Sequence, residues 1–519
     1  MFPLTPPGTV RMATSAPPAP AQSPVQKGLK IGALGLISSI VIGVASTAPG
    51  YSLAATIGYI GQEVGNRGPI IVLLAFIPML FISYAYKALN NVDPDCGTTF
   101  TWVSRAFDKR TGWINGWVIV AADIIVMANL AQIAGQYTYQ LLGLDSLADN
   151  AWATTILGCI WIAGMTWISW RGIELSARTQ VILLGLELLT LAIFSVVCLV
   201  KVYSGHAGSL AVHPSLSWFN PFGISAGALS AGFLLAVFIY WGWDSAVAVN
   251  EETDNAAVTP GRAAVMSTVI LLITYVVVTV AAQAFAGVGD KGIGLTNPAT
   301  IDDPLTGIGE ASLGSWGAKL LFIAILSSAA ASTQTTILPT ARTTLAMAAY
   351  KALPDKFREV HTRYQTPTFS TWAMGIVSIV FYALLTWLSP GSLNDLIAAI
   401  GLLIAFYYGF TGLASAWVFR NRASGKDRWL KVILPLLGAI ILFAAFIKTA
   451  IDSYAKDFGE TAPLGIGGVF VLGIGSILIG VVLMVIWNIM APAFFRGETM
   501  RSKVAIGEQG QVISTESID

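Results

Sequence analysis

Apolar residues fill long, nearly continuous runs that recur between about residues 31 and 491 of the chain. A helix needs roughly 20 such residues to cross about 30 Å of hydrocarbon, and each run reaches that length. The pattern therefore predicts an all-α membrane protein with twelve transmembrane helices. We place them at 31–58, 68–89, 111–142, 152–170, 175–202, 226–251, 262–287, 316–346, 367–389, 393–418, 430–450 and 465–491.

The polar segments between these runs predict the orientation of the chain. With a cytoplasmic N-terminus, and with basic residues near a helix end counted on the side of that end, the cytoplasmic side holds 23 of the 29 Lys and Arg residues. Positive residues accumulate on cytoplasmic loops, so both termini are expected in the cytoplasm. Residues 1–28 are rich in Pro, Ala and Ser and predict a disordered cytoplasmic tail. The polar residues 496–519 predict a second cytoplasmic tail.

Two of the predicted helices contain residues that interrupt a helix. The first contains STAPG at residues 46–50, and the sixth contains WGWD at residues 241–244. Proline and glycine are poor residues for a helix interior. A break within the membrane is tolerated only where protein or a water-filled cavity lines it. The carboxylate that ends WGWD is therefore expected to face a cavity near the middle of the membrane.

The two interrupted helices are five apart, which indicates two five-helix halves inserted in opposite directions. The prediction divides the chain into a first five-helix inverted repeat at 29–202, a second at 226–418, and trailing helices eleven and twelve at 429–491.

Composition excludes several classes of function. The chain has 55% hydrophobic and 11% charged residues and a mean hydropathy of +0.70. This composition excludes a soluble enzyme. A net charge of +1 without a basic run argues against nucleic-acid binding. No P-loop pattern is present, which argues against ATP as the energy source. The three cysteines, Cys96, Cys159 and Cys198, have no paired spacing, so we expect neither a disulfide framework nor a metal site.

Four stretches in order resemble the amino acid–polyamine–organocation (APC) superfamily over roughly residues 30 to 490. They are DPDCGTTFTWVSRAFDKRTGWINGW after the second helix, RGIELSARTQ at the start of the fifth, GWDSA followed by NEET in the sixth, and TARTTLAMAAYKALPDKFREVHTRYQTPTFS from the eighth into the ninth. The resemblance implies a leucine-transporter-type fold with five plus five inverted helices. It also implies a secondary active transporter rather than an enzyme.

The resemblance leads to a specific expectation of function. We expect a permease of the plasma membrane that carries amino acids by alternating access, in symport with protons and without a cofactor. A polyamine or another organic cation is an alternative cargo for the same fold. A gated channel or a nutrient sensor that transports nothing is an alternative from another class.

An amino acid needs hydrogen-bond donors for its carboxylate and acceptors for its ammonium group. The ends of a broken helix supply both, because N–H groups at the start of the second half-helix face an anion and carbonyl oxygens at the end of the first half face a cation. At the first break we expect the amides of Ala48, Gly50 and Tyr51 to bind the substrate carboxylate. The expected substrate-binding residues are Ser46, Thr47, Ala48, Gly50, Tyr51, Tyr240, Trp241, Trp243 and Asp244. A proline kink that serves packing alone, and aromatic residues that belong to the core, are the alternatives.

Deep carboxyl groups and a hydroxyl-rich helix are candidates for ion coupling. In proton-coupled relatives a lysine often follows the glycine that corresponds to Gly172 by fifteen residues, and here that position is Glu187. The expected coupling residues are Glu187, Asp123, Ser332, Thr333 and Thr336. The coupling ion is a proton or, if the hydroxyls of the eighth helix bind it, sodium. The alternatives are carboxyl groups that accept hydrogen bonds from neighbours such as Asn129, and hydroxyls that only let helices pack closely.

Overall fold

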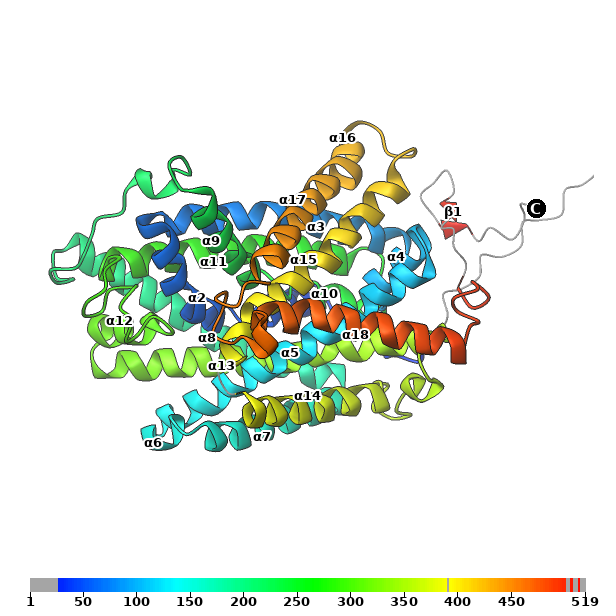
Figure 1. Cartoon of the computed structure of the whole chain (residues 1–519), viewed down its shortest axis with the longest axis horizontal. Helices are drawn as coiled ribbons and strands as arrows, with labels where there is room; N and C mark the ends of the chain where they lie inside the picture. The colour runs from blue at the N-terminus through cyan, green and yellow to red at the C-terminus, as the bar shows by residue number, and fades with distance from the viewer. Residues whose placement is uncertain (1–26, 390–391, 501–504, 507–511, 514–519) are drawn as a thin grey trace, which may run out of the picture.

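The structure is a computed structural model that describes residues 27–389, 392–500, 505–506 and 512–513 (Figure 1). Its first half contains α1 (Leu36–Ser46), α2 (Pro49–Val64), α3 (Gly68–Val92), α4 (Thr99–Ala106), α5 (Lys109–Leu141), α6 (Asp145–Ala148), α7 (Ala151–Arg171), α8 (Ile173–Tyr203), α9 (Ala226–Ile239) and α10 (Ser245–Ala248). The second half contains α11 (Thr259–Ala286), α12 (Pro304–Leu313), α13 (Ser315–Ala349), α14 (Thr368–Leu388), α15 (Ser392–Phe419), α16 (Gly425–Arg428), α17 (Leu434–Asp452), α18 (Gly468–Met490) and the short antiparallel strands β1 (Ala505–Ile506) and β2 (Val512–Ile513).

The described part of the chain is an all-α membrane protein. Ten of its helical segments are long and apolar enough to cross a membrane. One of these segments, Leu36–Val92, contains α1, α2 and α3 together, and α9 is a shorter apolar helix of 14 residues. The helices begin and end within a few residues of the predicted runs, apart from the first, which starts later and continues to Val64. Sequence patterns did not predict α4 and α12, which lie within connecting segments.

The segment before α1 packs against the rest of the protein. Residues 1–26 of the predicted N-terminal tail lie outside the described residues, but Lys27 is buried. Leu34 then pairs with the segment after α10: its amide donates to the Glu252 carbonyl oxygen at 3.0 Å, and the Asp254 amide donates to the Leu34 carbonyl oxygen at 2.8 Å. Residues 31 and 32 form a turn and Leu34 pairs with Thr253 in an isolated β-bridge, so α1 begins at Leu36 and not near residue 31. Of the predicted C-terminal tail, the structure describes 496–500 and the two strands.

The predicted interruptions are both present. The first separates α1 from α2 at Thr47 and Ala48, and Pro49 occupies the first turn of α2, where its missing N–H is no loss. The second separates α9 from α10 over residues 240–244, where Gly242 has a φ of +119°. A Cβ on Gly242 would lie 2.6 Å from the Ser46 carbonyl oxygen. The two breaks therefore touch through their backbones, and only glycine fits at the contact.

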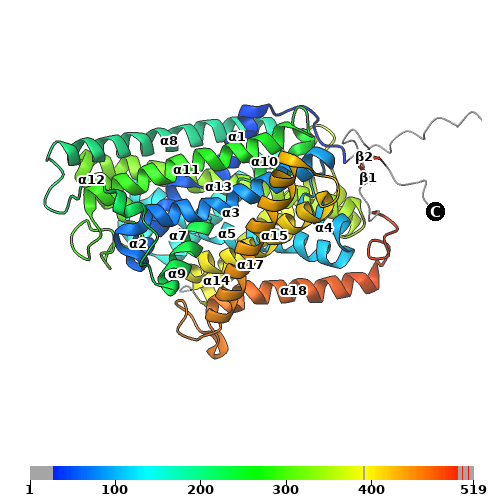
Figure 2. The same ribbon diagram turned by 90° about the horizontal axis from the view of Figure 1, so that it is seen from above.

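The connecting segments gather at two opposite ends of the helices. In both views α4 lies at the right, with the C-terminal end of the chain, and α12 lies at the left (Figures 1 and 2). At the α4 end the side chains of Lys27, Tyr350 and Thr499 meet the segments that precede α4 and follow α13. At the α12 end Tyr59 of α2 donates to Asp302 just before α12 at 2.5 Å.

Candidate functional site

The two helix breaks share a hydrogen-bonded core with α13. The hydroxyls of Ser46 and Ser245 lie 2.8 Å apart, one from each break. Ser332 of α13 donates to the Ser46 carbonyl oxygen at 2.9 Å. This carbonyl lies at the end of α1, where the last carbonyl groups have no donor within the helix. Ser245 lies 3.5 Å from the Thr335 carbonyl oxygen on the same helix. Small hydroxyl residues thus hold both breaks against α13.

A small cavity, the break-one cavity, lies beside the first interruption. It is lined by Ser46, Thr47, Ala48, Tyr51, Ser52, Val126, Leu130, Phe238, Trp241 and Ser332. Its volume of about 10 Å³ is room for about one water molecule. Four of the residues predicted at the first break line this cavity, and Gly50 does not.

The amides at the first break already have partners within the protein. The Gly50 amide donates to Glu187 Oε1 at 2.6 Å and the Tyr51 amide to Ser328 Oγ at 3.2 Å. The Ala48 amide donates to the Ala45 carbonyl oxygen at 3.1 Å. These are the amides that are expected to bind a substrate carboxylate. In this structure a carboxylate of the protein itself occupies the N-terminal end of α2, where the helix dipole favours an anion.

Glu187 lies deep in α8 and is fully buried. One of its oxygens accepts from Gly50, whereas Oε2 has no hydrogen-bond partner among the described residues. Two of the other expected coupling residues, both on α13, donate elsewhere: Ser332 to the Ser46 carbonyl oxygen and Thr333 to the Ala329 carbonyl oxygen at 2.8 Å. The α13 hydroxyl beside Glu187 is that of Ser328, one turn closer to the start of the helix.

Three tyrosine hydroxyls donate to Asp244, the carboxylate of the second break. Tyr408 lies 2.9 Å from Oδ1, and Tyr407 and Tyr86 lie 3.1 and 3.3 Å from Oδ2. Sequence reasoning missed all three, because they come from α3 and α15, far away in the chain. The adjacent pair Tyr407 and Tyr408 inside an apolar run was the available signal, since a buried phenol usually finds a partner.

Asp244 lines a second cavity, the break-six cavity. Its other lining residues are Ser46, Ile119, Asp123, Trp241, Gly242, Ser245, Thr336, Pro339 and Tyr407. Like the first cavity, it has a volume of about 10 Å³. Thr340 of α13 donates to Asp123 Oδ2. Two predicted carboxylates from different helices, Asp123 and Asp244, therefore share one small space.

The three aromatic residues predicted as cavity walls have different surroundings. Trp241 lines both cavities, and its indole N–H donates to the Tyr407 hydroxyl at 2.5 Å. Trp243 packs against Tyr86 and Tyr408 with ring centroids 5.1 and 5.2 Å apart. Tyr240 packs edge-on against the Tyr275 ring at 5.0 Å. Of the three, only Trp241 is among the residues that line the break-one and break-six cavities.

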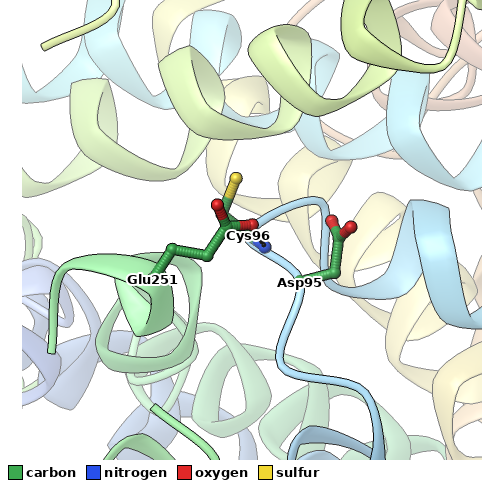
Figure 3. A group of neighbouring side chains, drawn as sticks. All are labelled: Asp95, Cys96 and Glu251. Carbon is green, nitrogen blue, oxygen red and sulfur yellow. Dashed lines mark hydrogen bonds between the residues drawn. The ribbon is translucent and has the colours of Figure 1, made fainter. Parts of the chain in front are cut away.

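A separate polar cluster lies near the start of α4 (Figure 3). Ligand-type atoms of Asp95, Cys96 and Glu251 lie within 4.8 Å of one another, a spacing that suits a metal ion. However, the Lys27 ammonium lies 2.9 Å from the Asp95 carboxylate and 2.5 Å from the Glu251 carboxylate. The Tyr350 hydroxyl donates to Asp95 at 2.7 Å. A buried lysine thus supplies the positive charge that the two carboxylates need.

The charges of this cluster shift the pKa values of its members. Burial alone would raise the pKa of Asp95, but the Lys27 ammonium and the Arg105 guanidinium hold it well below its ordinary range. Burial alone would lower the pKa of Lys27, but the Asp95 carboxylate holds it above its ordinary value. Both groups are therefore charged at neutral pH, and the N-terminal segment is bound to the core by a buried ion pair.

Comparison with known proteins adds evidence that is independent of this geometry. A family model described as amino acid permease matches residues 31–487. The branched-chain amino acid permease BcaP of Lactococcus lactis is 26% identical over 440 residues, which cover 80% of this chain and 89% of the relative. The vacuolar cationic amino acid transporter 4 of Arabidopsis thaliana is 25% identical over 74% of this chain and 62% of its own length.

A mammalian relative has a similar level of identity. The Asc-type amino acid transporter 1 of Mus musculus is 24% identical over 81% of this chain and 72% of its own length. The family match covers most of the sequence, and these relatives are transport proteins. The chain therefore belongs to the amino acid permease family of the APC superfamily and is a transporter, not an enzyme.

Proposed function

We infer that the protein carries amino acids across the plasma membrane by alternating access, in symport with protons. Family membership supports an amino acid as cargo. One relative is named for branched-chain amino acids and another for cationic amino acids. Family membership alone therefore does not identify the side chain of the amino acid that this protein carries. The coupling rests on one observation, which is the contact between Glu187 and the Gly50 amide at the first helix break.

The proposal includes a twelve-helix arrangement of five plus five inverted helices and two trailing ones. Segment Leu36–Val92 has 57 residues, nearly three times the length that one crossing needs, and is assigned two crossings. Together, α9, the turn after it and α10 make the sixth crossing. The inverted repeats are then residues 29–202 and 226–418, and residues 429–491 hold the two trailing helices. Direct contact between the breaks in α1–α2 and α9–α10 supports this assignment, because a binding site between broken helices is a property of such repeats.

The substrate is proposed to bind at the two breaks. Its α-ammonium group suits the carbonyl end of α1 and the hydroxyls of Ser46 and Thr47, and its carboxylate suits the amides at the start of α2. Trp241 lines both cavities, and each cavity has room for about one water molecule. Substrate entry therefore requires Trp241 to move and the breaks to separate. Tyr240 and Trp243 are proposed to support this site through packing and not through contact with the substrate.

Glu187 is proposed to link proton binding to substrate binding. As an anion, it competes with the substrate carboxylate for the Gly50 amide and for the positive end of the α2 dipole. Its second oxygen has no partner among the described residues, and an unpaired buried charge is costly. A proton on that oxygen removes the charge, weakens the bond to Gly50 and frees the amide for the substrate. Proton and substrate then favour each other's binding, as symport requires.

The test uses the Glu187→Gln protein in liposomes. Glutamine keeps an acceptor oxygen for Gly50 but carries no charge and takes up no proton. We expect this variant to exchange labelled amino acid at a rate within about tenfold of the wild type. We also expect it to fail to accumulate amino acid under an imposed pH gradient, because binding no longer depends on a proton. Glu174→Gln on the same helix is the control, since Glu174 is exposed and pairs with Lys30.

Two results would contradict the proton assignment. Accumulation by Glu187→Gln with an unchanged dependence on the pH gradient would move the coupling proton elsewhere, with Asp123 as the next candidate. Uptake by the wild type that follows a sodium gradient would assign coupling to sodium and make the hydroxyls of Ser332, Thr333 and Thr336 its expected ligands. Conductance without counterflow would instead indicate a channel.

A further inference from the structure

The break-six cavity contains two carboxylates and little to balance them. Asp123 comes from α5 and Asp244 from the second break, and both side chains are more than nine-tenths buried. The hydrogen-bond donors to both groups are neutral hydroxyls, three tyrosines for Asp244 and Thr340 for Asp123. No Lys or Arg among the described residues forms an ion pair with either carboxylate. The buried cations Lys27 and Arg342 pair with other carboxylates, at Asp95, Glu251 and Glu252.

Two polar groups on the wall of this cavity lack a partner. Only Oδ2 of Asp123 accepts a hydrogen bond, so Oδ1 has no partner among the described residues. The hydroxyl of Thr336 is likewise without a partner in the described part of the chain, although the residue is only 4% exposed. The Asp123 oxygen can accept a hydrogen bond and the Thr336 hydroxyl can accept or donate one, so this wall of the cavity suits a molecule that donates hydrogen bonds.

The break-six cavity lies next to the proposed site for the α-amino and carboxylate groups of the substrate. Ser46 and Trp241 line both cavities, so a molecule held at the first break has the second cavity as its neighbour once Trp241 moves. The indole N–H of Trp241 donates to Tyr407, which in turn donates to Asp244. Movement of Trp241 therefore disturbs a donor of Asp244 at the moment when a substrate enters.

We propose that the break-six cavity binds the cationic end of the substrate side chain, so that the preferred cargo is an amino acid with a side-chain ammonium or guanidinium group. The proposal rests on the proposed function, because it assumes that the α-amino and carboxylate groups bind at the first break. A cation between Asp123 and Asp244 neutralises both carboxylates and donates to the free oxygen of Asp123 and to Thr336. An aliphatic side chain would enclose the same carboxylates without any counter-charge, which is costly in a site closed to water.

The test compares L-lysine with L-norleucine, which has the same carbon chain without the terminal ammonium. Binding of each to the purified full chain is measured by thermal shift and by competition against labelled lysine. We expect lysine to bind at least about tenfold more tightly than norleucine, the ratio that one charge-assisted contact supplies. Asp123→Asn should reduce this ratio to about threefold or less, whereas Asp302→Asn, which alters an exposed carboxylate outside the cavity, should leave it unchanged.

The possible results separate this inference from the proposed function. Equal binding of lysine and norleucine by the wild type overturns the inference and leaves amino acid transport intact. A lysine preference that survives in folded Asp123→Asn protein overturns the role of Asp123. If the diamine putrescine binds and lysine does not, both proposals fail, because the cargo then lacks a carboxylate. Should Asp123→Asn not fold, the wild-type ratio of lysine to norleucine affinity still decides the question.

Discussion

The two glycines at the helix breaks differ in what an added side chain would meet. At Gly242 a Cβ would lie 2.6 Å from the Ser46 carbonyl oxygen, and the φ of +119° is strained for any other residue. At Gly50 the nearest atom to a Cβ is Glu187 Oε1 at 3.4 Å, an ordinary contact. The site thus tolerates a small side chain at Gly50 but not at Gly242. A larger residue at Gly50 would press on Glu187.

We therefore predict different results when each of these two glycines is replaced by alanine. Gly242→Ala should lower the melting temperature clearly and abolish uptake, because it combines a strained backbone with a clash against backbone atoms. Gly50→Ala should retain the fold and at least about half of the uptake, since its methyl group fits. Melting temperatures in detergent and uptake into liposomes check both. Normal transport by Gly242→Ala would show that the two breaks are not held in contact in the working protein.

Residue chemistry explains why part of the site could be predicted from the sequence. Pro49 and Gly242 interrupt helices by their own backbone properties, so the sequence alone located both breaks. Asp244 was noticeable because a carboxylate is rare in an apolar run. Its three tyrosine donors, and the bond between Glu187 and Gly50, depend on how distant helices pack. No local pattern reports such contacts, and for that reason the amides of α2 were assigned to the substrate.

At the scale of elements, the segment before α1 is bound to the rest of the protein mainly through Lys27. Its ammonium joins the loop between α3 and α4 to the segment after α10 through Asp95 and Glu251. Composition suggested a tail up to residue 28, because proline and alanine dominate there. In the sequence, Lys27 near the end of this tail looks the same as a lysine that is exposed to solvent. Its partners are 68 and 224 residues away, so the burial of Lys27 could not be read from local sequence.

Loss of the Lys27 ammonium is predicted to destabilise the protein in a pH-dependent manner. Lys27→Met removes the ion-pair partner of the buried Asp95 and of the partly buried Glu251. Removal of one partner from a buried ion pair costs about 3–5 kcal/mol. In the wild type the pKa of Asp95 is lowered, and this stabilises the fold at every pH above the ordinary pKa of an aspartate. The stabilisation is lost only when the pH falls through the lowered pKa. In the variant the unpaired carboxylates take up protons more readily, so acid relieves their repulsion.

The melting temperatures of both proteins between pH 5 and pH 8 test this prediction. The deficit of Lys27→Met should be largest near pH 8 and should shrink towards pH 5. Lys30→Met is the matched control, because its partner Glu174 is exposed and such pairs contribute little. A deficit that is constant across this range would mean that lost packing, and not charge, accounts for the effect of Lys27→Met.

At the scale of the whole molecule, the positions of the connecting segments agree with the distribution of charge. The segments that contain most of the Lys and Arg residues meet at the α4 end, through contacts such as those of Lys27 with Asp95 and of Thr499 with the Tyr350 carbonyl oxygen. The segments assigned to the outer side meet at the α12 end, where Arg67 donates to the Phe222 carbonyl oxygen at 2.5 Å. The sequence predicted this division from two independent signals, the apolar runs and the charges. The two crossings that the sequence predicts in Leu36–Val92 and the one that it predicts over residues 226–251 stay predictions, because a broken helix does not meet the length criterion for a single crossing.

Cysteine labelling in intact cells is predicted to settle both the orientation and the number of crossings. In a background without the three native cysteines, we expect a membrane-impermeant maleimide to label Ser146→Cys and Ser204→Cys. Ile31→Cys, Lys356→Cys and Ser424→Cys should react only after permeabilisation; all five positions are exposed.

If Leu36–Val92 crossed only once, positions 31 and 146 would lie on the same side. If α9–α10 did not cross, positions 204 and 356 would lie on the same side. Reversal of the whole pattern would instead place both termini outside and contradict the inference from charge.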